Sequence, residues 1–156
     1  MRAVVQRVSS ASVAVVDRET ARELTEIDRG LLVLVGIERG DSHEDVQYIA
    51  SKIRGLRVFD DPADRSRHLR LSVVDVSGAI LVVSQFTLLG DCRKGLRPSF
   101  DASEQPEQAR GLYEELLTEL RLGQLEVHRG EFRATMRVSL VNEGPVTVLL
   151  DSRRRF

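Results

Sequence analysis

The sequence predicts an α/β fold, with a mixed, mostly antiparallel β core in two sheets and two helices on one face, in three layers (α/β/β). Apolar runs of strand type outnumber the stretches of helical periodicity by roughly three to one. Only two stretches repeat apolar residues at helical spacing. The 156 residues contain no repeat, low-complexity segment or linker, so we expect a single domain over residues 1–156.

Three strands are predicted before the first helix. Residues 2–16 form a long strand with a bend near Ser9, and residues 21–27 form a polar one. A turn at residues 28–30 leads into the apolar run of residues 31–37, which is short and therefore indicates a buried central strand.

The first helix begins at Asp41 or Ser42, either of which can cap it, and Glu44 and Asp45 suit its first turn. Its apolar face follows the helical period. That face consists of Val46, Ile49, Ala50 and Ile53.

The second half of the chain begins with another apolar strand over residues 79–89. Residues 90–105 then form the longest irregular stretch, and a loop of this length in a compact domain is usually functional or disordered. Pro106 suits the first position of the second helix, which Gly123 can end. The remaining strands are predicted over residues 125–129, 135–142 and 146–150.

The last two strands are predicted to meet at a tight connection, Gly144-Pro145. An ordinary two-residue hairpin would carry Asn-Gly or Asp-Gly at this place. Proline offers no N–H to a sheet, fixes its own φ and restricts the residue before it. The pattern alone does not explain why this dipeptide stands between two strands.

The apolar strand of residues 79–89 is interrupted by Ser84, Gln85 and Thr87. Pattern alone favours a plain strand end, where the hydroxyl groups bond to nearby backbone. The functional alternative is a strand that ends in a site, so that its last residues face a ligand.

The cysteine and histidine content, the motifs and the apolar runs limit the classes of protein that this chain can belong to. The single cysteine, Cys92, excludes an internal disulfide and favours a cytosolic setting. A Cys–His hydrolase with His43, His68 or His128 is conceivable, although no known cysteine-protease signature surrounds Cys92. No ligand spacing indicates a metal, no glycine-rich phosphate loop is present, and no apolar run can cross a membrane.

The formal net charge of −1 argues against a general nucleic-acid coat, yet the basic residues are clustered. For any one cluster taken alone, a solvated loop is the simpler interpretation, and a local phosphate site is the alternative. The clusters are Arg65, Arg67 and Arg70; Arg93, Lys94 and Arg97; and Arg153 to Arg155.

Taken together, these stretches resemble the bacterial D-aminoacyl-tRNA deacylase family from end to end. The resemblance is carried by MRAVVQRVSSASV at 1–13, GLLVLVGI at 30–37, SQFT at 84–87, RPSF at 97–100 and NEGPVT at 142–147. One loop departs from the family pattern, because RHLR at 67–70 stands where many members carry Lys-Met-Asn.

The resemblance implies a cytoplasmic, cofactor-free homodimer that hydrolyses the ester between a D-amino acid, or glycine, and the 3′-terminal adenosine of tRNA. It implies that Ser84, Gln85, Phe86 and Thr87 line the site for the adenosine and the ester. It further implies that Gly144-Pro145 is cis and reaches into the partner subunit's pocket, where it rejects L-amino acids.

Several mechanistic expectations follow for that site. Thr87 has no base beside it in SQFT, so backbone N–H groups around Phe86 and Thr87 are expected to stabilise the oxyanion while water attacks. Arg93, Lys94 and Arg97 are expected to hold acceptor-stem phosphates. Two alternatives stay open: the Cys92 hydrolase, and a non-catalytic RNA-binding β module, for which the aromatic content of 4% is low.

Overall fold

The computed structural model describes residues 1–17, 20–64, 68–122 and 124–156. Its strands form one six-stranded sheet in which β2 (Thr20–Ile27), β1 (Arg2–Asp17), β3 (Gly30–Gly36), β4 (Ala79–Ser84) and β5 (Val127–Arg129) follow one another. The sixth strand, β6 (Met136–Asp151), pairs with β1. The pairs that involve β1 are antiparallel, whereas β3–β4 and β4–β5 are parallel.

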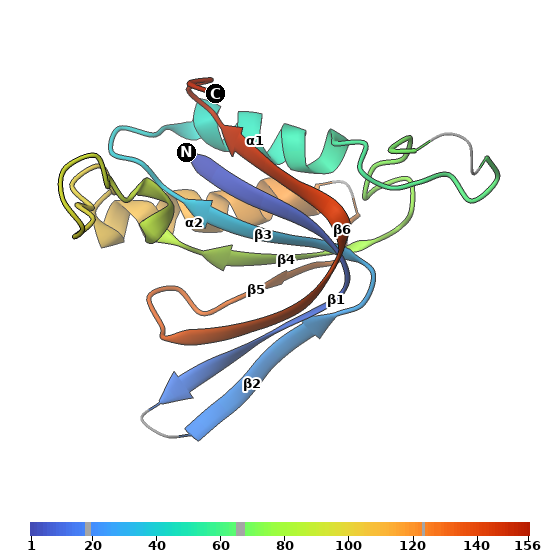
Figure 1. The fold of residues 1–156 in the computed structure, drawn as a ribbon, viewed down its shortest axis with the longest axis horizontal. Helices are drawn as coiled ribbons and strands as arrows, with labels where there is room; N and C mark the ends of the chain where they lie inside the picture. Colours follow the sequence, from blue (N-terminus) through green and yellow to red (C-terminus); the bar gives the residue numbers. More distant parts are fainter. Residues whose placement is uncertain (18–19, 65–67, 123) are drawn as a thin grey trace.

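The length of β1 explains how one sheet makes two layers. The first half of β1 pairs with β3 and the second half pairs with β2, while β6 follows β1 along both halves. The sheet therefore curls, and in Figure 1 β2 lies on the side away from the helices. The two predicted sheets are the two halves of this curled sheet, joined by continuous hydrogen bonding.

The helices α1 (His43–Gly55) and α2 (Pro106–Arg121) cover one face of the sheet (Figure 1). Alternate residues of β3 and β4 face different layers, as the pleat requires. Leu31 and Ile80 pack in the core beneath the helices, whereas Leu32 and Leu81 pack against the folded-over half of the sheet. This two-sided burial confirms the predicted three-layer α/β arrangement.

Most predicted elements agree with the structure. Ser42 is the N-cap of α1, and Pro106 occupies the start of α2. The predicted helix end at Gly123 lies outside the described residues. No helix among the described residues is long and apolar enough to cross a membrane.

Two elements differ from the prediction. The strand predicted over residues 79–89 ends at Ser84, and the chain then forms a short 3₁₀ helix, η1 (Phe86–Leu89). The two strands predicted on either side of Gly144-Pro145 are one strand, β6, so the dipeptide does not connect a hairpin. It lies in a bulge of β6, because β6 pairs with the same strand, β1, both before and after the dipeptide.

Candidate active site

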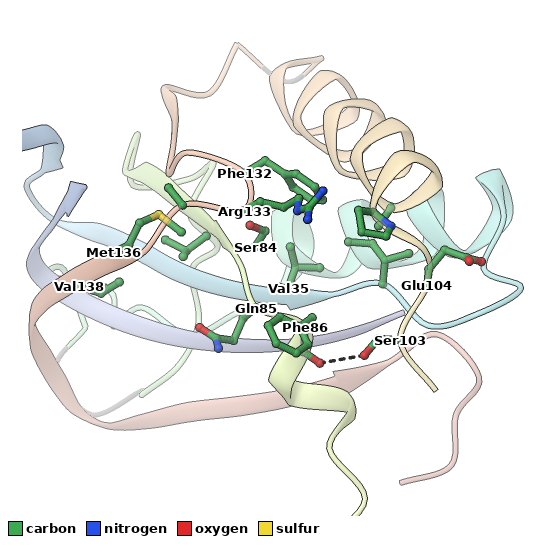
Figure 2. A pocket seen from close by; sticks show the side chains of 15 residues that line it. Val35, Ser84, Gln85, Phe86, Ser103, Glu104, Phe132, Arg133, Met136 and Val138 are labelled. Atoms are coloured by element: carbon green, nitrogen blue, oxygen red, sulfur yellow. Dashed lines mark hydrogen bonds between the residues drawn. The ribbon is translucent and has the colours of Figure 1, made fainter. Parts of the chain in front are cut away.

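A cavity of about 500 Å³ opens where β4 ends. This volume falls in the range of small-molecule sites, which are mostly apolar with a few polar groups. Figure 2 shows Phe132 and Arg133 together at one wall and Gln85 and Phe86 at another. The remaining lining residues are Val35, Ile37, Val83, Ser84, Ser103, Glu104, Pro106, Ala109, Ala134, Met136 and Val138.

The SQFT segment forms one wall of this cavity because β4 stops there. The start of this segment is bonded to the end of β3, since the N–H of Gln85 donates to the carbonyl of Val35 at 2.7 Å. The hydroxyl of Ser103 donates to the carbonyl of Phe86 at 3.3 Å. Ser84 and Gln85 are half-buried, whereas Phe86 and Thr87 are exposed.

The turn at Phe86 leaves backbone donors free. The first N–H groups of a helix have no acceptor within it. Among the described residues, no acceptor is recorded for the N–H of Phe86 or of Thr87. Two adjacent N–H groups beside the cavity are therefore available to donate to a ligand.

Thr87 follows the lining residues, and among the described residues its hydroxyl contacts the amide of Gln85. The Gln85 side-chain amide donates to Thr87 Oγ1 at 2.5 Å. Within the described part of the chain, no histidine or carboxylate contacts Thr87. A hydroxyl without a base is a poor nucleophile, and the recorded contacts do not activate that of Thr87.

The geometry around Cys92 does not support the Cys–His hydrolase. Cys92 is exposed and free. His43 contacts Glu115, His68 contacts Asp60, and His128 contacts Thr25 and Glu126. None of these contacts joins a histidine to Cys92, so the described part of the structure contains no Cys–His pair.

Gly144-Pro145 projects from β6 in a wide bulge. Gln6 pairs with Thr147 and Val8 pairs with Asn142, so four residues of β6 oppose the single residue Arg7. The Gly144–Pro145 peptide bond is cis, as the resemblance implied. Both residues are exposed.

Arg7 holds this bulge from within the sheet, a role that sequence reasoning missed. Its guanidinium donates to the carbonyl of Glu143 at 3.0 Å and to that of Val58 at 2.6 Å. The Asn142 amide donates to the carbonyls of Arg7 and Val146 at 2.8 and 3.1 Å. Arg7 is only 8% exposed, and a charged residue at a core-facing strand position was the signal available in the sequence.

Within one chain, Gly144-Pro145 and SQFT lie far apart. Arg7, which faces the bulge, pairs with Leu31, and Leu31 pairs with Ile80, four residues before Ser84. Four residues along a strand and three strand spacings across the sheet each amount to roughly 13–14 Å. The two motifs are therefore on the order of 20 Å apart and cannot contact one small ligand within the same chain.

The predicted RNA-binding cluster is not uniform. Arg93 forms a paired contact with Asp91, at 2.9 and 2.6 Å, and this guanidinium lowers the pKa of the Asp91 carboxyl. Lys94 and Arg97 are exposed, with no ion pair recorded among the described residues. They lie in a loop that backbone hydrogen bonds between Asp91 and Ser99 close at its base.

The other basic clusters differ again. Arg65 and Arg67 lie outside the described residues. Arg155 pairs with Glu38 and Asp151, and Arg153 donates to the carbonyl of Arg39. These contacts give the C-terminal arginines a structural role in anchoring the last residues of the chain.

The cavity itself carries two charged side chains, Glu104 and Arg133, which sequence reasoning did not single out. The Glu104 carboxylate accepts hydrogen bonds from the N–H groups of Gln105 and Gly40, and these lower its pKa. Among the described residues, no three His, Cys, Asp or Glu side chains are grouped as a metal site would require.

Comparison with known proteins gives a consistent result. Residues 4–151 match the family model described as D-Tyr-tRNA(Tyr) deacylase. The D-aminoacyl-tRNA deacylases of Koribacter versatilis and Thermotoga petrophila are 53% and 50% identical to this chain over 156 residues, with both chains fully covered.

Solved structures agree on the fold. One, described as c-Myc DNA unwinding element binding protein, is 40% identical with a TM-score of 0.87, and the match covers 97% of this chain and 98% of the other. Another, described as a probable eukaryotic D-amino acid tRNA deacylase, has a TM-score of 0.78, with 96% and 97% covered. At 16% identity, this second likeness concerns the fold alone.

Proposed function

The chain belongs to the family of D-aminoacyl-tRNA deacylases, and we propose that it hydrolyses the ester between a D-amino acid and the 3′-terminal adenosine of tRNA. Glycyl-tRNA is included, because glycine has no side chain to exclude. The observation that carries the proposal is the end-to-end match, 53% identical over all 156 residues. The function places the enzyme in the cytoplasm, where charged tRNA is used.

The cavity at the end of β4 is proposed to hold the terminal adenosine, with the scissile ester beside SQFT. The N–H groups of Phe86 and Thr87 would then stabilise the oxyanion that forms as water attacks the ester carbonyl. The 2′-hydroxyl of the adenosine is available to orient this water or accept its proton. The free backbone donors and the Gln85–Thr87 hydrogen bond both support this assignment.

Replacing Thr87 by Ala tests the positioning role. Because the backbone donors remain, kcat should fall by about tenfold or less, the loss expected for one hydrogen bond of about 1 kcal/mol. Single-turnover kinetics on D-aminoacyl-tRNA measure this effect. Complete loss of activity, or a trapped aminoacyl ester on the wild-type hydroxyl, would instead assign Thr87 as the nucleophile.

Chiral selection is proposed to require a second copy of the chain. The dipeptide and SQFT are too far apart within one subunit, and a two-fold dimer can bring each dipeptide to the partner's cavity. Leu140, Val141 and Leu149 expose apolar side chains along β6, beside the dipeptide in sequence, and could be covered by such a partner. With the ester and the α-ammonium held, the side chain of an L-amino acid would collide with Gly144-Pro145.

Contact with tRNA beyond the terminal adenosine is proposed for Lys94 and Arg97, which have no recorded ion pair. Arg93 is expected to contribute less, because Asp91 neutralises it. Changing Lys94 and Arg97 together to Gln should raise KM for tRNA and reduce the slope of log KM against log salt by about 1.5. The Arg93→Gln enzyme is the matched control, and an unchanged slope in the double variant would make this loop a solvated surface.

The experiment that tests the function compares hydrolysis of D-, L- and glycyl-tRNA by the wild-type chain. Rapid release from the D- and glycyl esters with the L-ester preserved is expected. No hydrolysis of any ester would favour a binding module, and activity that disappears in Cys92→Ser would favour the thiol hydrolase.

A further inference from the structure

Arg133 lines the cavity between two other lining residues, Phe132 and Ala134. Contacts with other elements hold the chain in place before and after Arg133. The Phe132 ring packs on Tyr113 at 5.6 Å and lies beneath the Arg110 guanidinium at 5.0 Å. On the other side, the carbonyl of Thr135 accepts the N–H of Val16 at 2.8 Å. Arg133 therefore has a fixed backbone position at the wall of the cavity.

The backbone of Arg133 is in the left-handed region, with φ 67°. This conformation suits glycine, because a Cβ crowds the neighbouring backbone there. Residues that carry a Cβ in this region tend to occur at functional sites. Of the non-glycine residues with positive φ that the structure describes, Arg133 is the one that lines the cavity. The position would suit a residue without a side chain, yet it carries a long cation.

The guanidinium of Arg133 has no recorded partner among the described residues, unlike that of most arginines nearby. Arg129 is paired with Glu114, and Arg22 is paired with Glu131. The other charged group of the cavity, Glu104, accepts from backbone N–H groups. Arg133 is exposed, and among the described lining residues it is the charged side chain with no recorded partner.

The chemistry of the proposed substrate identifies the group that this cation would bind. The ester is neutral and the α-ammonium of the amino acid is positive. At the reactive end of the molecule, the nearest anion is the phosphate that joins the terminal adenosine to the preceding nucleotide. A guanidinium binds phosphate oxygens with two parallel hydrogen bonds.

We propose that Arg133 binds this phosphate and so positions the terminal adenosine in the cavity. The inference rests on the proposed function and adds a specific contact to it. Arg133 is a positioning residue for the ester, since it holds a group next to the one that reacts. The contact should appear in KM rather than in kcat.

The test compares two minimal substrates, D-aminoacyl-adenosine and D-aminoacyl-adenosine 5′-monophosphate. In the wild-type enzyme the phosphate should lower KM about tenfold, as one charge-assisted hydrogen-bonded pair does. In Arg133→Gln this advantage should vanish, while the two enzymes should act equally on the substrate without phosphate. Competitive inhibition of D-aminoacyl-tRNA hydrolysis by adenosine and by 5′-AMP provides the same comparison if the minimal esters react slowly.

Three further variants separate the charge from the backbone. Arg133→Lys should keep part of the advantage. Arg133→Gly should lose the KM advantage of the phosphate without lowering the melting temperature, because glycine adopts this positive φ without steric cost. Arg137→Gln, which removes an exposed arginine of β6 outside the cavity lining, should keep it in full.

The outcomes separate this inference from the proposed function. A wild-type enzyme that does not hydrolyse D-aminoacyl-tRNA would refute the function. A wild-type enzyme that hydrolyses it, with the same phosphate advantage in Arg133→Gln, would overturn the role of Arg133 alone.

Discussion

Replacing Phe86 by proline should lower kcat on D-aminoacyl-tRNA by about 10²–10³-fold relative to Phe86→Ala, because it removes one N–H of the proposed oxyanion site. Both variants lose the aromatic ring and its edge-on contact with Phe100, at 5.1 Å between centroids. They differ at the backbone, since only proline lacks the N–H. The ratio of the two kcat values therefore isolates a single backbone donor.

The fold should accept this proline. Phe86 is the first residue of η1, where a helix loses no hydrogen bond to proline. The preceding residue, Gln85, is extended at φ −144° and ψ 81°, outside the helical region that proline disfavours in its predecessor. Equal melting temperatures for the two variants provide the control. Equal kcat values would show that the N–H of Phe86 does not take part in the reaction.

Replacing Gly144 by Ala should lower activity on D-aminoacyl and glycyl esters by about 100-fold while leaving the fold intact. A Cβ at Gly144 would meet only Asn142, with Oδ1 at 3.5 Å and the carbonyl oxygen at 3.9 Å, which are ordinary contacts. Stability should therefore change by no more than about 0.5 kcal/mol. The added methyl would instead meet the substrate bound by the partner subunit. Gly111→Ala, on an open helix face, is the matched control and should remain active.

A mixture of variants tests whether the dipeptide works across a dimer. A Gly144→Ala subunit combined with a Phe86→Pro subunit leaves one of the two sites with both parts intact. Random pairing of equal amounts makes about half of the dimers mixed, so activity should recover to about a quarter of wild type. Absence of recovery, in a sample that light scattering shows to be dimeric and exchanged, would place both parts of each site in one subunit.

The sequence predicted the elements whose burial leaves a local pattern. Leu31–Val35 and Ile80–Val83 are apolar without alternation because the helices cover one face of these strands and the curled sheet covers the other. The N-terminus of α1 was predictable from Ser42, because capping depends on residues within one turn.

The bulge of β6 was not predictable in this way. In the sequence, Gly144-Pro145 interrupts the strand pattern in the same way whether it forms a hairpin turn or a bulge within one strand. The choice depends on β1, where Arg7 and the amide of Asn142 satisfy the carbonyls that the bulge leaves unpaired. Similarly, Arg133 reaches the cavity because β5 and β6 bring residues 132–134 beside the end of β4, a juxtaposition that no local pattern records.

The bulge also determines what a change in the length of this segment would do. Beyond it, Val146 and Leu150 are buried and Val148 packs against the core, whereas Thr147 and Leu149 point outward. The pairs Val8–Asn142 and Gln6–Thr147 fix β6 on either side of the bulge, so the register of Thr147 and Leu149 is set by β1. A residue inserted or deleted at the dipeptide would be taken up by the unpaired bulge, and it would move Gly144-Pro145 relative to Arg7 and Asn142, which hold the bulge. The residue count of this segment therefore sets how far the dipeptide projects from β6, while the core beneath it keeps its register.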